Sequence, residues 1–432
     1  MIENVDEIYW DKTFDKIRMK SKVGRYLMRA GGNTRRLPGF QDLVFVPKPF
    51  RPAVRPEEVN TRVKLGGYYA ERPLEVAMPI IIAPMSYGAL SKPAKIALAK
   101  GSAMADTCTS TGEGGMMPEE RAAAKQMIFQ CLPGRYGWNI RDMLRADGLE
   151  LLISQGAKPG MGGHLMAEKM TEEIARIRGL PRDIDLRSPS RHPDILGADD
   201  LVIKIEEFRE ATDWKIPVSL KLAMGRIKDD IRIAVNDKAD MVQLDGEQGS
   251  TGAAPDTTME NLGIPTMCGL ANAVLSLHEM GWFGRIDIVV MGGIRHGGDA
   301  AKAIAMGAKA VAVGMGVLMA MGCTGCLQCF TGRCPKGIAT QDPNLTKLLD
   351  IDEAAEGVYN YLTAMNEEIK LICASLGKRD IGELNRDDLQ ALTIDVSAMT
   401  GLPLIGTGRV IKALKTSYNH KTDLRRGLSD GY

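Results

Sequence analysis

The sequence lacks an excess of charge of either sign. Lysine and arginine together number 55 against 54 acidic residues in a chain of 432. Proteins whose main partner is nucleic acid or an anionic membrane surface carry a basic excess, so neither is expected here. No apolar run approaches the roughly 20 residues of a membrane span, and residues 1–6 lack the basic start and apolar core of a signal peptide. We therefore expect a cytoplasmic protein without nucleic-acid or membrane partners.

Cysteine is scarce outside one short segment. Four of the eight cysteines are scattered at positions 108, 131, 268 and 373, and the other four lie within twelve residues of one another. A disulfide framework would spread its cysteines through the chain, whereas one metal site in a reduced compartment concentrates them. The sequence also has no internal repeats and no convincing NAD(P) fingerprint.

The concentrated cysteines are Cys323, Cys326, Cys329 and Cys334, and Pro335 follows the last of them. Their spacing is C-x2-C-x2-C-x4-C. Thiolates held by short loops at such spacing are typical of iron–sulfur clusters, while a zinc site more often has two well-separated pairs. The pattern therefore favours an iron–sulfur cluster, with zinc or purely structural thiols as the alternatives.

The middle of the chain alternates short apolar runs with helical patterns. The strand candidates are residues 78–85, 107–111, 127–130, 151–155, 218–222, 241–245, 286–291 and 310–314. Helical spacing is clearest over residues 92–104, 199–211, 228–237 and 270–280. This alternation predicts an α/β protein with a parallel sheet, and about eight strands predict closure into a (β/α)8 TIM barrel.

The chain divides into four parts. Residues 1–75 form an N-terminal arm, rich in Arg, Lys, Pro and Gly, that we expect to be solvated or to face a partner. Residues 76–322 form the barrel, with a long Gly- and Pro-containing insertion at 159–199 that is a candidate active-site loop. Residues 323–342 form the cysteine loop. Residues 343–432 form a mostly helical extension, with helices expected at 345–361, 365–375 and 384–393.

Two glycine-rich turns follow the last two strands. Gly292 and Gly293 come directly after one strand, and Gly314 with Met315 follows the next. Glycines leave backbone N–H groups free to approach an anion, and the start of the following helix adds partial positive charge. In β/α barrels the last two strands commonly carry a phosphate site. A phosphate site beside a cysteine cluster indicates a flavin nucleotide with an iron–sulfur partner.

Several charged residues follow or occupy the strands. Lys221 lies inside an apolar strand, where an ammonium group is costly unless it meets an anion or an electron-rich ring. Such a lysine stabilises a reduced flavin, although a lysine that extends from a strand end to water is an equal alternative. Glu113 is a candidate acid/base or ammonium-binding group, or a loop acid paired with Arg135. Lys125, Lys158 and Arg178 could bind a dicarboxylate, or be ordinary surface charges.

Five segments then carry a family resemblance. They are APMSYGALS at residues 83–91, TGEGG at 111–115, QGAKPG at 155–160, GSTGAAP at 249–255 and CFTGRCPKGIATQDP at 329–343. In this order they resemble the FMN-binding synthase domain of glutamate synthases. The resemblance implies a β/α barrel that binds FMN and a 3Fe–4S cluster. Cys323, Cys329 and Cys334 match the three cluster ligands of the family, and the additional Cys326 leaves a 4Fe–4S cluster open.

The resemblance also implies roles for individual residues. The cofactor-binding residues would be Met85, Ser86, Lys125, Lys221, Gly249, Thr251, Gly292, Gly293, Arg295, Gly314 and Met315. The substrate-binding residues would be Gln155, Lys158, His164 and Arg178, and the catalytic residues Glu113, Lys158 and Lys221. One departure stands out: the family commonly has Gly-Glu-Gly-Gly-Gln after its Lys-Pro pair, whereas this chain has GMGGH at residues 160–164. This difference puts the usual substrate of the family in doubt.

The stand-alone barrel is similar to the large subunit of N-methylglutamate synthases, the methylamine–glutamate N-methyltransferases. This likeness implies glutamate and methylamine as substrates. It also implies a hetero-oligomer with amidotransferase-like and glutamate-synthase C-terminal-domain-like subunits. Three alternatives stay open. They are a glutamate synthase subunit that uses 2-oxoglutarate and ammonia, a non-catalytic electron-transfer subunit, and an enzyme similar to IMP dehydrogenase, which would leave the cysteines unexplained.

Overall fold

The computed structural model describes residues 5–411, with side chains from residue 14 onward. Its centre is an eight-stranded parallel sheet in the order β5-β15-β14-β12-β11-β8-β7-β6, which confirms the predicted barrel. Thr107 Oγ1 donates a hydrogen bond of 2.5 Å to Ile80 O, which links the two ends of the sheet. The barrel strands are β5 (Ile80–Ile82), β6 (Cys108–Ser110), β7 (Gln126–Cys131), β8 (Gly148–Leu152), β11 (Val218–Ala223), β12 (Met241–Asp245), β14 (Asp287–Met291) and β15 (Ala310–Val313).

The strands form because each is a short apolar run that is buried on both faces. Every residue of β5, β8, β11 and β12 is buried. Parallel strands covered by helices on one side and filled by side chains on the other have this composition. The sequence-based bounds agree with the observed ones to within a few residues, and the bounds of β12 agree at both ends.

Helices surround the barrel and expose their polar faces. In α7 (Ile227–Asn236) the buried residues Ile227, Ile231, Ala234 and Val235 recur at helical spacing. The other helices of this layer are α2 (Lys92–Met104), α3 (Pro118–Ala123), α4 (Ile140–Met143), α6 (Ala198–Ala211), α9 (Thr266–Glu279), α10 (Gly297–Ala305) and α11 (Met315–Ala320). Helix α8 (Asp256–Asn261) instead packs against the two-stranded sheet of β1 (Met28–Gly32) and β13 (Ser250–Pro255). The helices predicted at 92–104, 199–211, 228–237 and 270–280 are confirmed as α2, α6, α7 and α9.

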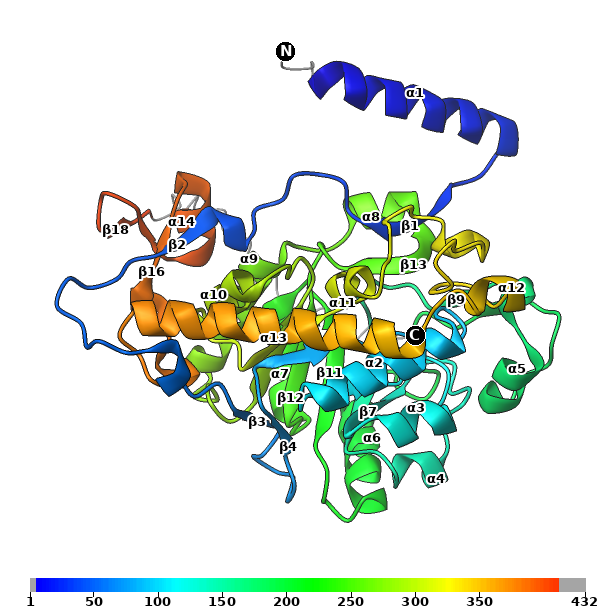
Figure 1. Ribbon diagram of the computed structural model, residues 1–432, viewed down its shortest axis with the longest axis horizontal. Helices are drawn as coiled ribbons and strands as arrows, with labels where there is room; N and C mark the ends of the chain where they lie inside the picture. Colours follow the sequence, from blue (N-terminus) through cyan, green and yellow to red (C-terminus); the bar gives the residue numbers. More distant parts are fainter. Residues whose placement is uncertain (1–4, 412–432) are drawn as a thin grey trace, which may run out of the picture.

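The N-terminal segment reaches both ends of the barrel. Helix α1 (Val5–Val23) projects from the body, and β1 (Met28–Gly32) pairs antiparallel with β13 (Ser250–Pro255), after β12 (Figure 1). The hairpin of β3 (Val63–Leu65) and β4 (Leu74–Val76) lies at the opposite end, where Gly66 N donates to Asp287 Oδ2 at 2.8 Å. The arm is therefore part of the barrel's structure at both ends.

The segment after the cysteines is dominated by one long helix. Helix α13 (Ile351–Ser375) follows the short α12 (Pro343–Thr346) and packs its buried side on α2 and α10 (Figure 1). The expected break between residues 361 and 365 is absent. The last described helix is α14 (Ile394–Thr400), followed by β17 (Pro403–Leu404) and β18 (Arg409–Val410). The part of the expected helical extension at 412–432 lies outside the described residues.

The helix predicted over 384–393 is wrong. The segment contains a short turn and β16 (Leu389–Ala391), which pairs antiparallel with β2 (Leu43–Phe45). Asp388 Oδ2 accepts from Asn385 N at 2.9 Å, and Asn385 Oδ1 accepts from Asp387 N at 3.0 Å. Side chains that bond nearby backbone in this way favour turns over helix interiors.

The insertion after β8 has little regular structure. It contains a two-residue ladder between β9 (His164–Leu165) and β10 (Leu186–Arg187), and the helix α5 (Glu172–Arg178) between them. Among the described residues, no helix has the length and apolar content needed to cross a membrane.

Candidate functional site

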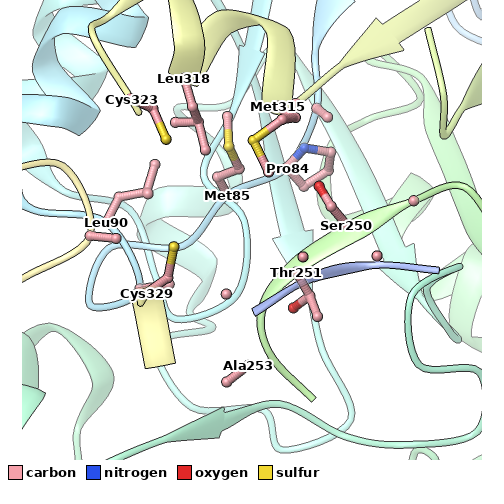
Figure 2. A pocket seen from close by; sticks show the side chains of 18 of the residues that line it. Pro84, Met85, Leu90, Ser250, Thr251, Ala253, Met315, Leu318, Cys323 and Cys329 are labelled. Carbon is pink, nitrogen blue, oxygen red and sulfur yellow. The ribbon is translucent and has the colours of Figure 1, made fainter. Parts of the chain in front are cut away.

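A large cavity of about 1010 Å³ opens at the carboxyl ends of the barrel strands. Met85 and Ser86 line it after β5, Glu113 after β6, and Gln155 with Lys158 after β8. The loop after each parallel strand leaves the barrel at the same end, which is why residues far apart in sequence meet here. Figure 2 shows this wall, with Met85, Thr251 and Met315 beside the cysteine loop.

The glycine turn after β14 leaves no room for side chains. Gly292 and Gly293 have φ values of 101° and 77°, and a Cβ on Gly293 would stand 2.9 Å from Gln248 Cβ. Thr266 Oγ1 donates to Gly292 O at 2.8 Å and so fixes the turn. Glycine is required by both the backbone conformation and the space. The turn, with Gly314 and Met315 after β15, thus presents bare backbone to the cavity.

Lys221 extends from β11 into the cavity. Only 6% of its surface is exposed, and its Nζ lies 3.6 Å from Oδ2 of Asp245 on the neighbouring strand β12. A buried ammonium needs a compensating negative charge, which Asp245 supplies. Glu150 lies on the other neighbouring strand, β8, and its burial raises the pKa of its carboxyl group. Lys221 is therefore a cation held inside the barrel, and does not extend to water.

Glu113, Gln155 and Lys158 form a polar group on the same wall. Gln155 Nε2 donates to Glu113 Oε1 at 3.2 Å. Burial lowers the pKa of Lys158, against the opposing effect of Glu113. Gly163 faces the same carboxylate, because a Cβ there would overlap Glu113 Oε2. An acid, an amide and an ammonium are thus brought together at one end of the cavity.

A buried ion pair joins the loops that carry Met85 and Glu113. Lys95 Nζ lies 2.7 Å from Glu120 Oε1 in the interior, and it donates to Ser110 O and Thr111 O, each at 3.1 Å, and to Met85 O. Burial raises the pKa of Glu120 to about 7. The ammonium therefore holds the carboxyl ends of β5 and β6 at a fixed separation.

All four clustered cysteines line the cavity. Figure 2 shows the sulfur atoms of Cys323 and Cys329 pointing toward each other. Burial raises the pKa of the Cys329 thiol, and the charges of Cys323, Cys334 and Cys326 raise it further, as expected of thiols gathered at one place. Within residues 14–411, whose side chains are described, no three His, Cys, Asp or Glu side chains are already arranged around a common metal position.

Lys169 connects the cysteine segment to the insertion. Its Nζ donates to Ala89 O at 3.0 Å, Ala339 O at 3.3 Å and Cys329 O at 3.5 Å. Burial lowers its pKa to about 8, and the Cys329 and Cys334 thiols act in the opposite direction. One buried ammonium thus contacts both the loop after β5 and the cysteine loop.

The chain is similar to known proteins over most of its length. Residues 51–379 match the family described as the conserved region in glutamate synthase. Over 417 residues the chain is 42% identical to a glutamate synthase large subunit-like protein of Rhizobium meliloti, in a match that covers 92% of this chain and 94% of the relative. This chain belongs to the glutamate synthase family. The family resemblance of the five sequence motifs is thereby confirmed.

Other members of the glutamate synthase family are longer. An archaeal NADPH glutamate synthase of Methanocaldococcus jannaschii is 39% identical over 338 residues, which are 78% of this chain and 66% of the relative. Among solved structures, a mandelate oxidase mutant with a monooxide FMN adduct has a TM-score of 0.52 and 20% identity. That match covers 82% of this chain and 92% of the oxidase chain, and at this identity it shows the barrel fold alone.

Most of the residues expected at the site of this glutamate synthase family member lie on the cavity. They come from different strands and loops, and the barrel brings them to one end. They are Met85, Ser86, Glu113, Gln155, Lys158, His164, Lys221, Gly249, Thr251, Gly292, Gly293, Arg295, Gly314, Met315, Cys323, Cys326, Cys329 and Cys334.

Two expected site residues lie elsewhere. Lys125 precedes the amino end of β7, so it lies at the opposite end of the barrel from the cavity, where its ammonium pairs with Asp106. Arg178 is buried behind the loop that carries Glu113. Its Nη2 donates to Tyr87 O at 2.6 Å, and its guanidinium lies 5.1 Å from the centre of the Tyr136 ring. Arg178 therefore packs behind the cavity wall and is not part of it.

Other cavity residues are not among the site residues expected from the sequence. They are residues 31–33 of the N-terminal arm, Gln130, Lys169, Asp245, Gln248, Lys336 and Tyr361. Asp245 is the last residue of a predicted strand, and this position predicts that it lies at the cavity end of the barrel. The arm and Tyr361 carry no such signal, because their place depends on contacts far along the chain, such as the ladder of β1 with β13.

Proposed function

We propose that this chain is the FMN-binding subunit of an N-methylglutamate synthase, which forms N-methylglutamate and ammonia from glutamate and methylamine. The observation that carries the proposal is a single cavity that unites a bare glycine turn, the buried cation Lys221 and the group of Glu113, Gln155 and Lys158. This donor set suits a phosphorylated, electron-accepting ring next to a small dicarboxylate.

The chain's residues fit FMN. The turn at Gly292 and Gly293 excludes any Cβ and offers backbone N–H groups to a phosphate, together with Gly314 and Met315. Lys221 supplies positive charge inside the barrel, where it would stabilise a reduced ring. When bound, FMN would accept a hydride from the substrate α-carbon and return one to it.

Glutamate would be held by complementary charge. The Lys158 ammonium lines the cavity in a largely buried position, and it enters no ion pair within the part of the chain that the structure describes. A substrate carboxylate would supply the missing negative charge. Gln155 offers amide hydrogen-bonding groups beside it, and Glu113 would accept a proton from the substrate ammonium, because the amine must be neutral before its α-carbon loses hydride.

Exchange of the nitrogen would complete the reaction. Loss of hydride from glutamate gives the imine 2-iminoglutarate, methylamine replaces ammonia on the imine carbon, and return of hydride gives N-methylglutamate. Electrons balance without an external donor, and no methyl cation moves. The GMGGH segment at 160–164 supports a changed substrate, since His164 lines the cavity where the family commonly has glutamine.

We include an iron–sulfur cluster and partner subunits in the proposal. The four thiols of Cys323, Cys326, Cys329 and Cys334 share the cavity wall, and cysteine thiolates are the usual ligands of such clusters. Three cysteines would hold a 3Fe–4S cluster, and Cys326 would allow a 4Fe–4S cluster. The separate partners would be amidotransferase-like and glutamate-synthase C-terminal-domain-like subunits in a hetero-oligomer.

A second candidate function is supported by the archaeal NADPH glutamate synthase, which is 39% identical to this chain. In that case the cavity would bind 2-oxoglutarate and ammonia, and the reaction would need external electrons. A third candidate is a subunit that binds both cofactors for electron transfer and does not act on glutamate.

One anaerobic titration separates the three functions. The protein with its partner subunits is mixed with glutamate while the visible flavin absorbance is followed, and methylamine is then added. Bleaching by glutamate, recovery with methylamine and N-methylglutamate by mass, all without NADPH, support the proposal. Oxidation of a pre-reduced flavin only by 2-oxoglutarate with ammonia would instead favour glutamate synthase. No response to either pair would favour electron transfer.

A further inference from the structure

Lys169 is a buried cation at the meeting point of three segments. It ends the short turn Ala167–Lys169 in the insertion, and 7% of its surface is exposed. Its three hydrogen-bond acceptors are the carbonyl oxygens of Ala89, Cys329 and Ala339. Ala89 follows β5 in the loop that carries Met85 and Ser86, while Cys329 and Ala339 both lie within the segment 323–342.

The surroundings of this ammonium are backbone carbonyl groups and thiols, and within residues 14–411 it forms no ion pair with a carboxylate. The thiols whose charge acts on it are Cys329 and Cys334. Lys169 and the thiols line the same cavity. In the interior, a fixed positive charge stabilises the more negative of two redox states, and neighbouring charge is one of the factors that set iron–sulfur potentials.

We propose that Lys169 is a positioning residue for the iron–sulfur cluster, which holds the cysteine loop against the loop after β5 and raises the reduction potential of the cluster. This inference rests on the cluster included in the proposed function. Lys169 belongs to the insertion, and its ammonium contacts the cysteine loop. The same residue would therefore join the insertion, which borders the proposed substrate site, to the proposed cluster site.

The chain provides a matched control. Lys336 lies two residues after Cys334, lines the same cavity and is exposed to solvent. Lys169→Met removes the charge and keeps a side chain of similar length, and Lys336→Met removes an equivalent charge that water screens. Lys169→Arg keeps the charge and the ability to donate to carbonyl groups.

The test is a redox titration of the cluster in the assembled protein, followed by its electron paramagnetic resonance signal, with iron and sulfide content measured in parallel. We expect a more negative midpoint potential in Lys169→Met, a smaller change in Lys336→Met and a near-normal potential in Lys169→Arg. An unchanged potential in Lys169→Met, with the cluster intact, would overturn the inference and leave the proposed function standing.

Loss of the cluster is also informative. If Lys169→Met loses iron and Lys169→Arg retains it, the positioning role is supported. If both variants lose iron, the charge and hydrogen bonds of residue 169 do not account for retention of the cluster, and the positioning role is overturned. If the unaltered protein assembles no cluster, both this inference and the iron–sulfur part of the proposed function fail. The FMN part of the proposed function is tested independently, by whether the protein retains FMN.

Discussion

The hydroxyl of Tyr361 donates a hydrogen bond of 2.9 Å to the carbonyl oxygen of Arg295. This contact joins the long helix α13 to the segment directly after the glycine turn of β14. A Cβ on Gly316, near the start of α11, would overlap the same hydroxyl. The C-terminal extension therefore closes the end of the cavity to which we assign the FMN phosphate.

Tyr361→Phe is expected to weaken FMN binding without unfolding the protein. The change removes one hydrogen bond and keeps the ring, and such a bond contributes roughly 0.5–1.5 kcal/mol. We expect an increase of about threefold to tenfold in the dissociation constant of FMN, measured by fluorescence on reconstitution of the apoprotein. Gly316→Ala, which would displace the hydroxyl, should act in the same direction. Equal affinity in all three proteins would contradict the closing role of α13.

Gly293→Ala is expected to abolish FMN retention. The residue has a φ of 77°, and a Cβ would stand 2.9 Å from Gln248 Cβ. Gly281→Ala is the control, because Gly281 has a φ of 72° and open space around it. Both variants carry similar backbone strain. A loss of bound flavin in Gly293→Ala alone, measured by absorbance after purification, would therefore place the FMN phosphate at the turn of Gly293. Equal flavin content in the two variants would contradict that assignment.

Glu113→Gln is expected to slow flavin bleaching by glutamate. The amide keeps the contact with Gln155 and removes the proton acceptor, for which a loss of about 100-fold to 10,000-fold is typical. Stopped-flow absorbance measures this rate, and FMN content should not change. The control is Glu168→Gln, which alters an exposed carboxylate outside the cavity. A normal rate in Glu113→Gln would remove Glu113 from the catalytic assignment.

The repeating parts of the fold are predictable, because each strand and helix is encoded locally. Apolar periodicity alone gives the bounds of β12 and α2. The cavity wall is predictable where residues closely follow a strand, as Gly292 does directly after β14 and Gln155 does three residues after β8. Lys125 is misplaced by such reasoning because it precedes its strand, and a position before a parallel strand lies at the other end of the barrel.

The remaining site residues depend on contacts that no local pattern encodes. Lys169 lies in the insertion at 159–199, whose composition predicts an active-site loop but does not single out this residue, and its acceptors on Ala89 and Ala339 are 80 and 170 residues away. Arg178 has the residue type of an anion-binding side chain. Its guanidinium instead lies over the Tyr136 ring, and this depends on how the insertion folds back.

His192 is expected to make folding stability depend on pH in mildly acidic solution. Its Nε2 lies 2.8 Å from Leu152 O, its Nδ1 accepts from Arg135 Nε at 3.2 Å, and burial lowers its pKa to about 4. The unfolded chain binds this proton at an ordinary pKa near 6.5. Stability from His192 is therefore fully present above about pH 6.5 and is lost as the pH falls toward about 4.

The size of this effect is on the order of 3 kcal/mol, because a tenfold change in proton affinity corresponds to about 1.4 kcal/mol. His192→Gln keeps a donor toward Leu152 and cannot titrate. Urea unfolding across this pH range should show a shallower fall in the free energy of unfolding for the variant than for the unaltered protein. Parallel pH curves for the two proteins would contradict a buried, neutral His192.

The central claim is that nitrogen, and not a methyl group, is exchanged on glutamate. It is tested most directly with glutamate labelled with heavy nitrogen, incubated anaerobically with methylamine, the assembled protein and no NADPH. We predict unlabelled N-methylglutamate and labelled ammonia, both measured by mass spectrometry. N-methylglutamate that keeps the heavy nitrogen would contradict the account, because it would require transfer of the methyl group to an intact amine.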